Sequence, residues 1–151
     1  MNPPLRSAAE IESILVALAD GTVDAIATDH APHASHEKQV EFERAAFGIT
    51  GLETALGLAI TKLHREHKNL TGAHCRTVYQ RSGARVRFAR GAVRWAAGVM
   101  PDVTIFDPKK RWTFDVGKSR SMARNSPFDG WAMTGKVIAT ASSAGAWCIG
   151  E

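Results

Sequence analysis

The sequence has few cysteines and no long apolar run. Its 151 residues include two cysteines, Cys75 and Cys148, whose separation fits no metal-binding or redox motif. Two cysteines do not make a disulfide framework, which favours a reducing compartment, and we expect a cytoplasmic protein. No apolar run approaches the ~20 residues of a membrane span, and Pro3, Pro4 and Arg6 stand where a signal peptide would be apolar. We therefore expect neither a membrane protein nor a secreted disulfide-rich one.

Acidic residues are missing between Glu66 and Asp102, although this stretch is rich in arginine. Its arginines are Arg76, Arg81, Arg85, Arg87, Arg90 and Arg94. The favoured interpretation is a solvated surface. A phosphate or nucleic-acid surface ranks behind it, because no stacking aromatic residues are interleaved at regular spacing. A third hypothesis is that the stretch arose through a local change of reading frame or is a segment whose sequence has drifted.

The first part of the chain predicts a helix followed by a strand. Ser7 and Glu10 form the S-x-x-E pattern of a capping box. The apolar stripe of this helix has i, i+3, i+4 and i+7 spacing and consists of Ile11, Ile14, Leu15 and Leu18. We expect the helix to span Ser7 to Ala19, with Gly21 in the left-handed position that follows it. The apolar run Val23–Ala27 has the length of a buried strand, which would make half of an α/β unit.

The polar segment from His33 to Gly48 predicts a long loop before a second helix. Thr50 and Glu53 repeat the capping-box pattern, and we expect this helix to end near His67. Its expected buried stripe is Leu52, Leu56, Ala59, Ile60 and Leu63.

Beyond Gly91 the pattern changes to short runs that are typical of strands, separated by Gly, Pro, Asp and Ser. The runs are Val103–Phe106, Trp112–Phe114, Val137–Ala141 and Ala146–Ile149. We therefore divide the chain into residues 1–90, which are α/β, and residues 91–151, which form a small β-rich unit.

Polar side chains follow the first predicted strand directly. Asp29, His30 and His33 come after Val23–Ala27, and Pro32 forces the chain out of the sheet. Barrels of alternating strands and helices place catalytic groups at the carboxyl ends of their strands. A carboxylate there can bind a metal ion and also transfer a proton. By itself this pattern is equally well explained by an aspartate that caps a turn.

The residues Thr28-Asp29-His30-Ala31-Pro32-His33 resemble the last-strand motif of the dihydroorotases, which are cyclic amidohydrolases of pyrimidine biosynthesis. Further segments resemble this family in the same order. They are Met1–Arg6, Phe47–Thr54, Asp102–Pro108 and Asn125–Trp131. Several matched segments in order are far more specific than any one of them. The resemblance covers most of the chain but only about the last third of the family's length.

This resemblance implies a fold and an activity. The expected fold class is α/β: the last strand–helix unit or units of an amidohydrolase-type TIM barrel, plus part of a small flanking β domain. The implied reaction is the hydrolysis of dihydroorotate to N-carbamoyl-aspartate by zinc-bound hydroxide. In the family the aspartate matched by Asp29 binds zinc and transfers the proton. The resemblance also implies substrate contacts for Asn2, His33, Phe47 and Gly48.

Much of a complete dihydroorotase site is missing from the sequence. No H-x-H pair occurs, and a complete eight-stranded barrel needs about 250 residues. Zinc normally takes three or four protein ligands, so Asp29 alone cannot hold it. We therefore expect a fragment that is inactive by itself and stable only when it pairs with itself or with a partner. The alternative is a non-catalytic interaction module, for which the carbamoyltransferase of the same pathway is one candidate partner.

Overall fold

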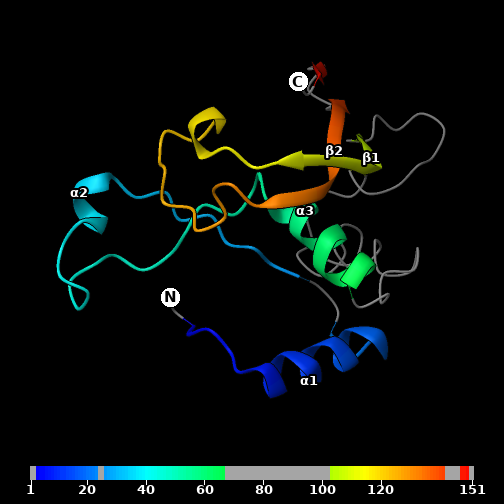
Figure 1. Cartoon of the computed structure of the whole chain (residues 1–151), viewed down its shortest axis with the longest axis horizontal. Helices are drawn as coiled ribbons and strands as arrows, with labels where there is room; N and C mark the ends of the chain where they lie inside the picture. The colour runs from blue at the N-terminus through cyan, green and yellow to red at the C-terminus, as the bar shows by residue number, and fades with distance from the viewer. Residues whose placement is uncertain (1–2, 24–25, 67–102, 142–146, 150–151) are drawn as a thin grey trace, which may run out of the picture.

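The structure is a computed structural model that describes residues 3–23, 26–66, 103–141 and 147–149. Figure 1 shows a helix near the N-terminus, long loops that extend to one side, and a small sheet with a second helix packed beneath it. Four sequence predictions lie outside the described residues: the substrate contact Asn2, the helix end near His67, the arginine-rich stretch and the domain boundary near Gly91. No helix in the described part is long and apolar enough to cross a membrane.

Helix α1, Ala8–Ala19, forms as predicted. Ser7 is its N-cap, and both hydrogen bonds of the capping box with Glu10 are present. Gly21 follows the helix with φ of +83°, the left-handed conformation that glycine adopts without a steric cost. Only half of the predicted stripe is buried: Leu15 and Leu18 are, whereas Ile11 and Ile14 are close to half exposed.

The predicted strand Val23–Ala27 is wrong where the structure describes it. Residues 23, 26 and 27 have extended or irregular backbone without strand pairing, and residues 24–25 lie outside the described part. A strand exists only with a hydrogen-bonded neighbour. The described residues supply none beside this run.

The segment from His33 to Gly48 is mostly loop, as predicted, with one short helix, α2, Ser35–Lys38. The second predicted helix begins later than expected. It consists of α3, Ala55–Leu58, which continues directly into a π-helix, Ala59–Glu66. Thr54, not Thr50, is the residue before the helix. Leu52, predicted to be buried, is 66% exposed, whereas Ile60 is buried.

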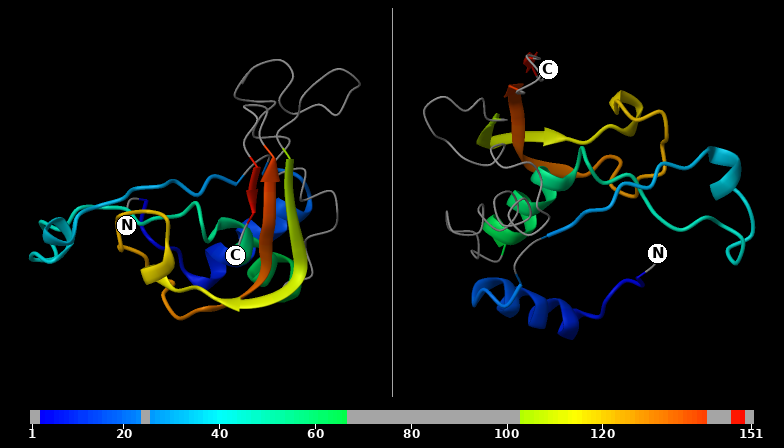
Figure 2. Two further views of the ribbon diagram at one scale, coloured as in Figure 1. Left: turned by 90° about the horizontal axis from the view of Figure 1, so that it is seen from above. Right: turned by 180° about the vertical axis from the view of Figure 1, so that it is seen from behind.

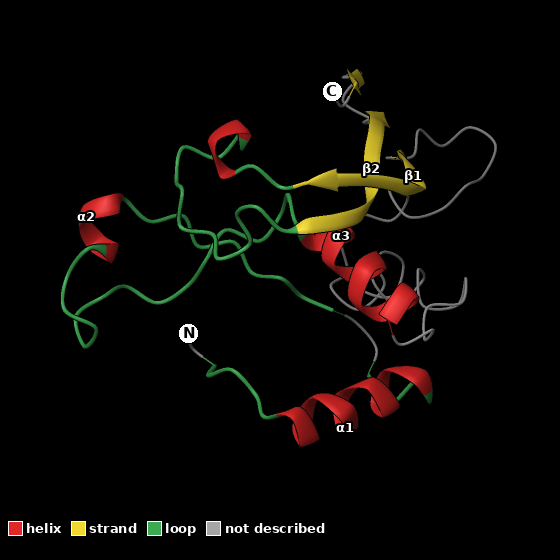
Figure 3. Cartoon of the chain, viewed as in Figure 1, coloured by secondary structure: helices red, strands yellow, loops and turns green. Residues whose placement is uncertain are grey.

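The C-terminal part is an antiparallel sheet in the order β1-β2-β3, with β1 Val103–Thr113, β2 Ala132–Ala141 and β3 Trp147–Ile149. Figure 3 shows β1 and β2 as long arrows above α3. Two of the predicted runs are therefore one strand. The reason is an irregularity between Asp107 and Arg111, where the Asp107 side chain accepts from the amides of Lys109 and Lys110. These bonds satisfy backbone amides that have no partner on β2. The predicted gap between two strands is therefore a bulge within one strand.

The core lies between β1, β2 and the helix formed by α3 and the π-helix Ala59–Glu66. Met133 on β2 is 2% exposed, and Ile60 packs against Gly135 of the same strand. Gly135 has φ of +87°, and a side chain at this position would overlap Ile60. The indole Nε1 of Trp112 donates to the Gly135 carbonyl at 2.9 Å. Figure 2 shows from a second direction that this helix lies against one face of the sheet.

Candidate functional site

Two loops that are far apart in the sequence lie side by side in the structure. The amide of Ala31 donates to the carbonyl of Ile49 at 3.0 Å, which joins the Asp29–His33 segment to the Phe47–Gly51 segment. Most of the predicted site residues lie on these two segments. Asn2 lies outside the described residues.

Asp29 is exposed and has φ of +54°, a left-handed conformation that is uncommon for residues other than glycine. Its Oδ1 accepts from the His30 amide at 2.7 Å, the one hydrogen bond of its side chain among the described residues. Gly51 lies against the Asp29 backbone so closely that a side chain at position 51 would overlap the Asp29 carbonyl oxygen. The loop therefore fixes the Asp29 backbone and leaves Oδ2 open to a ligand.

His30 bonds to the turn that precedes α3, at amides outside the capping box predicted for Thr50 and Glu53. Its Nδ1 accepts from the amides of Gly51, at 3.2 Å, and Leu52, at 3.4 Å. An Nδ1 that accepts carries no proton, so the ring proton of this histidine is on Nε2. The interpretation of His30 as a structural residue beside Asp29 agrees with these contacts.

The carboxylate of Glu53 reaches across to the C-terminal part of the chain. It accepts from the Ser119 hydroxyl and from the amides of Arg120 and Ser121, at 3.2 and 3.3 Å. Desolvation acts to raise the pKa of Glu53, but these bonds and the charge of Arg120 together outweigh it and lower the pKa. The predicted capping box of Glu53 with Thr50 is therefore wrong, because a stronger set of donors lies elsewhere.

His33 lies between two oxygen acceptors. Its Nε2 is 2.7 Å from the Phe47 carbonyl oxygen and, since a carbonyl can only accept, Nε2 carries a proton. Its Nδ1 is 3.6 Å from the Glu37 carboxylate. The Ala34 amide bonded to Glu37 lowers the pKa of that carboxyl group, against a smaller effect of desolvation, and His33 and His36 lower it further.

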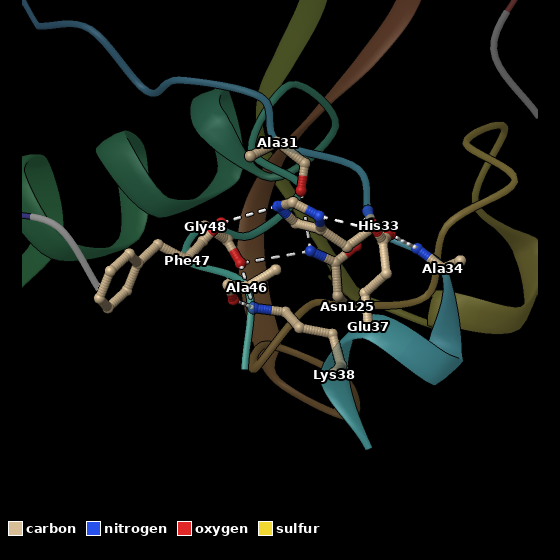
Figure 4. A network of polar contacts seen from close by, with 9 residues as sticks. All are labelled: Ala31, His33, Ala34, Glu37, Lys38, Ala46, Phe47, Gly48 and Asn125. Atoms are coloured by element: carbon tan, nitrogen blue, oxygen red, sulfur yellow. Dashed lines mark hydrogen bonds and ion pairs between the residues drawn. The ribbon is translucent and has the colours of Figure 1, made fainter. Parts of the chain in front are cut away.

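Phe47 and Gly48 take part through their backbone. The Phe47 side chain is 65% exposed, and Figure 4 shows its ring pointing away from the polar network around His33. Gly48 has φ of +105°, and a side chain there would overlap the Ala31 methyl group. Only glycine fits this position, which brings the Gly48 backbone next to the His33 ring.

Two further residues organise this cluster, and the sequence interpretation assigned them no role. Lys38 Nζ donates to the carbonyls of Ala46, at 2.6 Å, and Gly48, at 2.8 Å. The Asn125 side chain bonds to Ala31, His33 and Gly48 from the C-terminal part of the chain. Asn125 belongs to a segment that already resembled the family, but no local pattern indicates a contact across more than 90 residues.

The residues that the structure describes do not form a metal centre by themselves. They contain no group of three or more His, Cys, Asp or Glu side chains that could hold a metal ion. The open Oδ2 of Asp29 fits one ligand of a larger set, but His30 Nδ1 is already occupied by backbone amides. A zinc ion would need its other ligands from outside these residues.

Comparisons with known proteins find many relatives of one kind. The chain is 45% identical over 141 residues to a dihydroorotase from Citrifermentans bemidjiense, and 42% identical over 140 residues to one from Syntrophus aciditrophicus. Each alignment covers 93% of this chain and 32% of the relative. The chain thus spans about a third of the length of the curated relatives it matches. No family model matches the chain.

Solved structures with the same fold belong to related hydrolases. The chain superimposes on a dihydropyrimidinase from Brevibacillus agri with a TM-score of 0.81 at 23% identity, covering 97% of this chain and 32% of that one. An L-hydantoinase from Arthrobacter aurescens gives a TM-score of 0.80 at 26% identity, covering 92% and 32%. These matches confirm the predicted fold class, an α/β part of an amidohydrolase barrel with a flanking β unit. In sequence the chain corresponds to the C-terminal third of the dihydroorotases, and in fold to the amidohydrolase-superfamily hydantoinases.

Proposed function

We propose that this chain supplies one part of a dihydroorotase-type active site, which hydrolyses the cyclic amide of dihydroorotate to N-carbamoyl-aspartate. The single observation that carries the proposal is the conformation of Asp29. Its backbone is fixed by the contact with Gly51, while one carboxylate oxygen has no partner among the described residues. Such a group is available for chemistry, and similarity to the dihydroorotases supports the reaction class.

In this proposal Asp29 transfers the proton of the reaction. Water loses a proton to the Asp29 carboxylate as its oxygen attacks the ring amide carbon. The carbon–nitrogen bond then breaks, and Asp29 returns that proton to the leaving nitrogen. Zinc would supply the activation of water when bound, with Asp29 as one ligand. The other ligands must come from the part of the relatives that this chain does not match.

The substrate contacts are assigned to residues near His33. The Nε2–H of His33 donates to the Phe47 carbonyl in this structure and would exchange that acceptor for a substrate carboxylate. The resemblance also assigns the Phe47 and Gly48 backbone to the substrate ring, and Gly48 supports this because its backbone lies next to the His33 ring. Asn2 completes the set on the basis of the resemblance. The division into residues 1–90 and 91–151 is part of the same proposal.

A fusion protein tests the proposal. The portion of the Citrifermentans bemidjiense dihydroorotase that this chain does not match is joined in front of the 151 residues. We expect the fusion to hydrolyse dihydroorotate with zinc bound, and the chain alone and the added portion alone to be inactive. Asp29→Asn in the fusion should abolish turnover. Activity of the isolated chain, or full activity of D29N, would contradict the proposal.

A second candidate function is an interaction module without catalysis. Large apolar side chains are unusually exposed, with Phe42 at 96%, Met122 at 98% and Leu52 at 66%. Where such side chains form one contiguous patch, a partner commonly covers it. The partner would be a second copy of the chain or the carbamoyltransferase of the pathway. A chain that forms a stable complex, while its fusion remains inactive, would favour this function.

A further inference from the structure

The side chain of Asn125 lies between the two loops of the candidate site, as Figure 4 shows. Its Oδ1 accepts from the His33 amide at 3.1 Å. Its Nδ2 donates to the Ala31 carbonyl at 2.8 Å and to the Gly48 carbonyl at 3.3 Å. One side chain thus bonds to both loops at once. We propose that Asn125 is a positioning residue that fixes the distance between His33 and the Phe47–Gly48 backbone.

The chemistry of the amide group explains why asparagine is suited to this place. The two loops present one N–H group and two carbonyl oxygens, and a side-chain amide offers one acceptor and two donors. Its orientation is determined by these partners, since the reverse orientation would place oxygen against both carbonyls. An aspartate could accept from the His33 amide but could donate to neither carbonyl.

Asn125 is also anchored through its own backbone. Its carbonyl accepts from the amide of Thr50 at 3.2 Å, and Thr50 is buried. The residue therefore cannot shift without moving the segment that begins at Phe47. Since Ala31 and His33 bond to the same side chain, the spacing of the two loops depends on one amide group. Asn125 acts through His33 and Gly48 and does not itself need to touch a substrate.

The inference rests on the proposed function of His33, Phe47 and Gly48, but its test requires no substrate. The full 151-residue chain is compared with Asn125→Asp, which keeps the size and the acceptor and removes both donors. Ser126→Ala is the matched control, because among the described residues the Ser126 hydroxyl accepts only from the nearby Phe128 amide. The measurements are amide hydrogen exchange by NMR and the ¹⁵N chemical shifts of the His33 ring.

We expect N125D to raise exchange at the Ala31 amide, which bonds across the two loops to Ile49, by about tenfold, the factor that corresponds to loss of one or two hydrogen bonds. Exchange in α1 and at the β1–β2 pairs should stay unchanged. The ¹⁵N shifts of the His33 ring should change in N125D, because the distance to the Phe47 carbonyl is no longer fixed, whereas S126A should retain the shifts of the unaltered chain. The proposal is overturned if Ala31 and His33 are unprotected in the unaltered chain. Unchanged exchange in N125D, or a uniform rise over all elements, would overturn it as well. An inactive fusion protein would refute the proposed function and leave this result standing.

Discussion

Gly51 lies directly against the carbonyl oxygen of Asp29, in a space that no side chain can enter. The Thr28 carbonyl borders the same space, 3.0 Å from where a Cβ would lie. The backbone of the candidate catalytic residue is thus positioned by a glycine that follows it by 22 residues. Two consequences of this contact can be measured.

Gly51→Ala should destabilise the chain by about 1–3 kcal/mol, because the added methyl group must displace the Asp29 segment. In the fusion protein it should also reduce turnover. The free energy of unfolding in urea and the activity are the measurements. Gly21→Ala is the control, since nothing lies near its Cβ and its cost of about 1 kcal/mol comes from the positive φ alone. If G21A and G51A reduced activity equally, the contact would not position Asp29.

Glu53 should make stability depend on acid. Its folded-state pKa is lowered, so its contribution is present above the unfolded value near 4.5 and is lost as the pH falls through the folded pKa. Glu53→Gln should lower stability at neutral pH by about 1 kcal/mol, a modest value because the carboxylate is partly solvated. It should also flatten the loss of stability below pH 4.5.

Urea unfolding at a series of pH values measures this effect. Glu12→Gln, on the exposed surface of α1, is the matched control and should leave the profile unchanged. A profile of E53Q that falls as steeply as that of the unaltered chain would show that the bonds to residues 119–121 contribute little.

The third prediction concerns the core between β2 and the helix formed by α3 and the π-helix Ala59–Glu66. Met133 is 2% exposed, and its sulfur lies 2.9 Å from where a Cβ on Gly57 would be. Met133→Ala leaves a cavity at this contact and should cost about 2–5 kcal/mol in the free energy of unfolding. Ile138→Ala removes a side chain of similar size from the same strand, but that side chain is 43% exposed. Its cost should be within about 0.5 kcal/mol, and equal costs would place the core elsewhere.

The parts of this structure that the sequence predicted correctly depend on contacts near in sequence. The Ser7–Glu10 capping box joins residues only three positions apart, so α1 and its first residue follow from local chemistry alone. The Val23–Ala27 run failed because an apolar run becomes a strand only beside another strand. The predicted capping box of Thr50 and Glu53 failed for a related reason. The Glu53 carboxylate bonds instead to Ser119, Arg120 and Ser121, more than 60 residues away, and no spacing rule indicates these partners.

The candidate site shows the same division. Asp29 and His33 were found through a contiguous motif, and Gly48 through a resemblance to the same family. Asn125 bonds to Ala31 across 94 residues, a distance at which the sequence carries no periodic signal. The bulge at Asp107 also escaped prediction, because Asp107 and Pro108 indicate a break between strands, whereas the Asp107 carboxylate satisfies the amides of Lys109 and Lys110.

His33→Ala should weaken substrate binding in the fusion protein more than it slows the chemical step. The substitution removes the Nε2–H that would donate to the substrate carboxylate, and it leaves the Asp29 segment unchanged. A lost hydrogen bond to a charged group corresponds to a rise in KM of about 10- to 100-fold. The rate at saturating dihydroorotate should change far less, because the proton transfer depends on Asp29. Steady-state kinetics over a wide range of substrate concentration separate the two effects.

His36→Ala is the matched control, since His36 is an exposed histidine three residues away. Equal changes in H33A and H36A, or a fall in rate without a rise in KM, would remove His33 from the substrate contacts and leave its bond to Phe47 as a structural one.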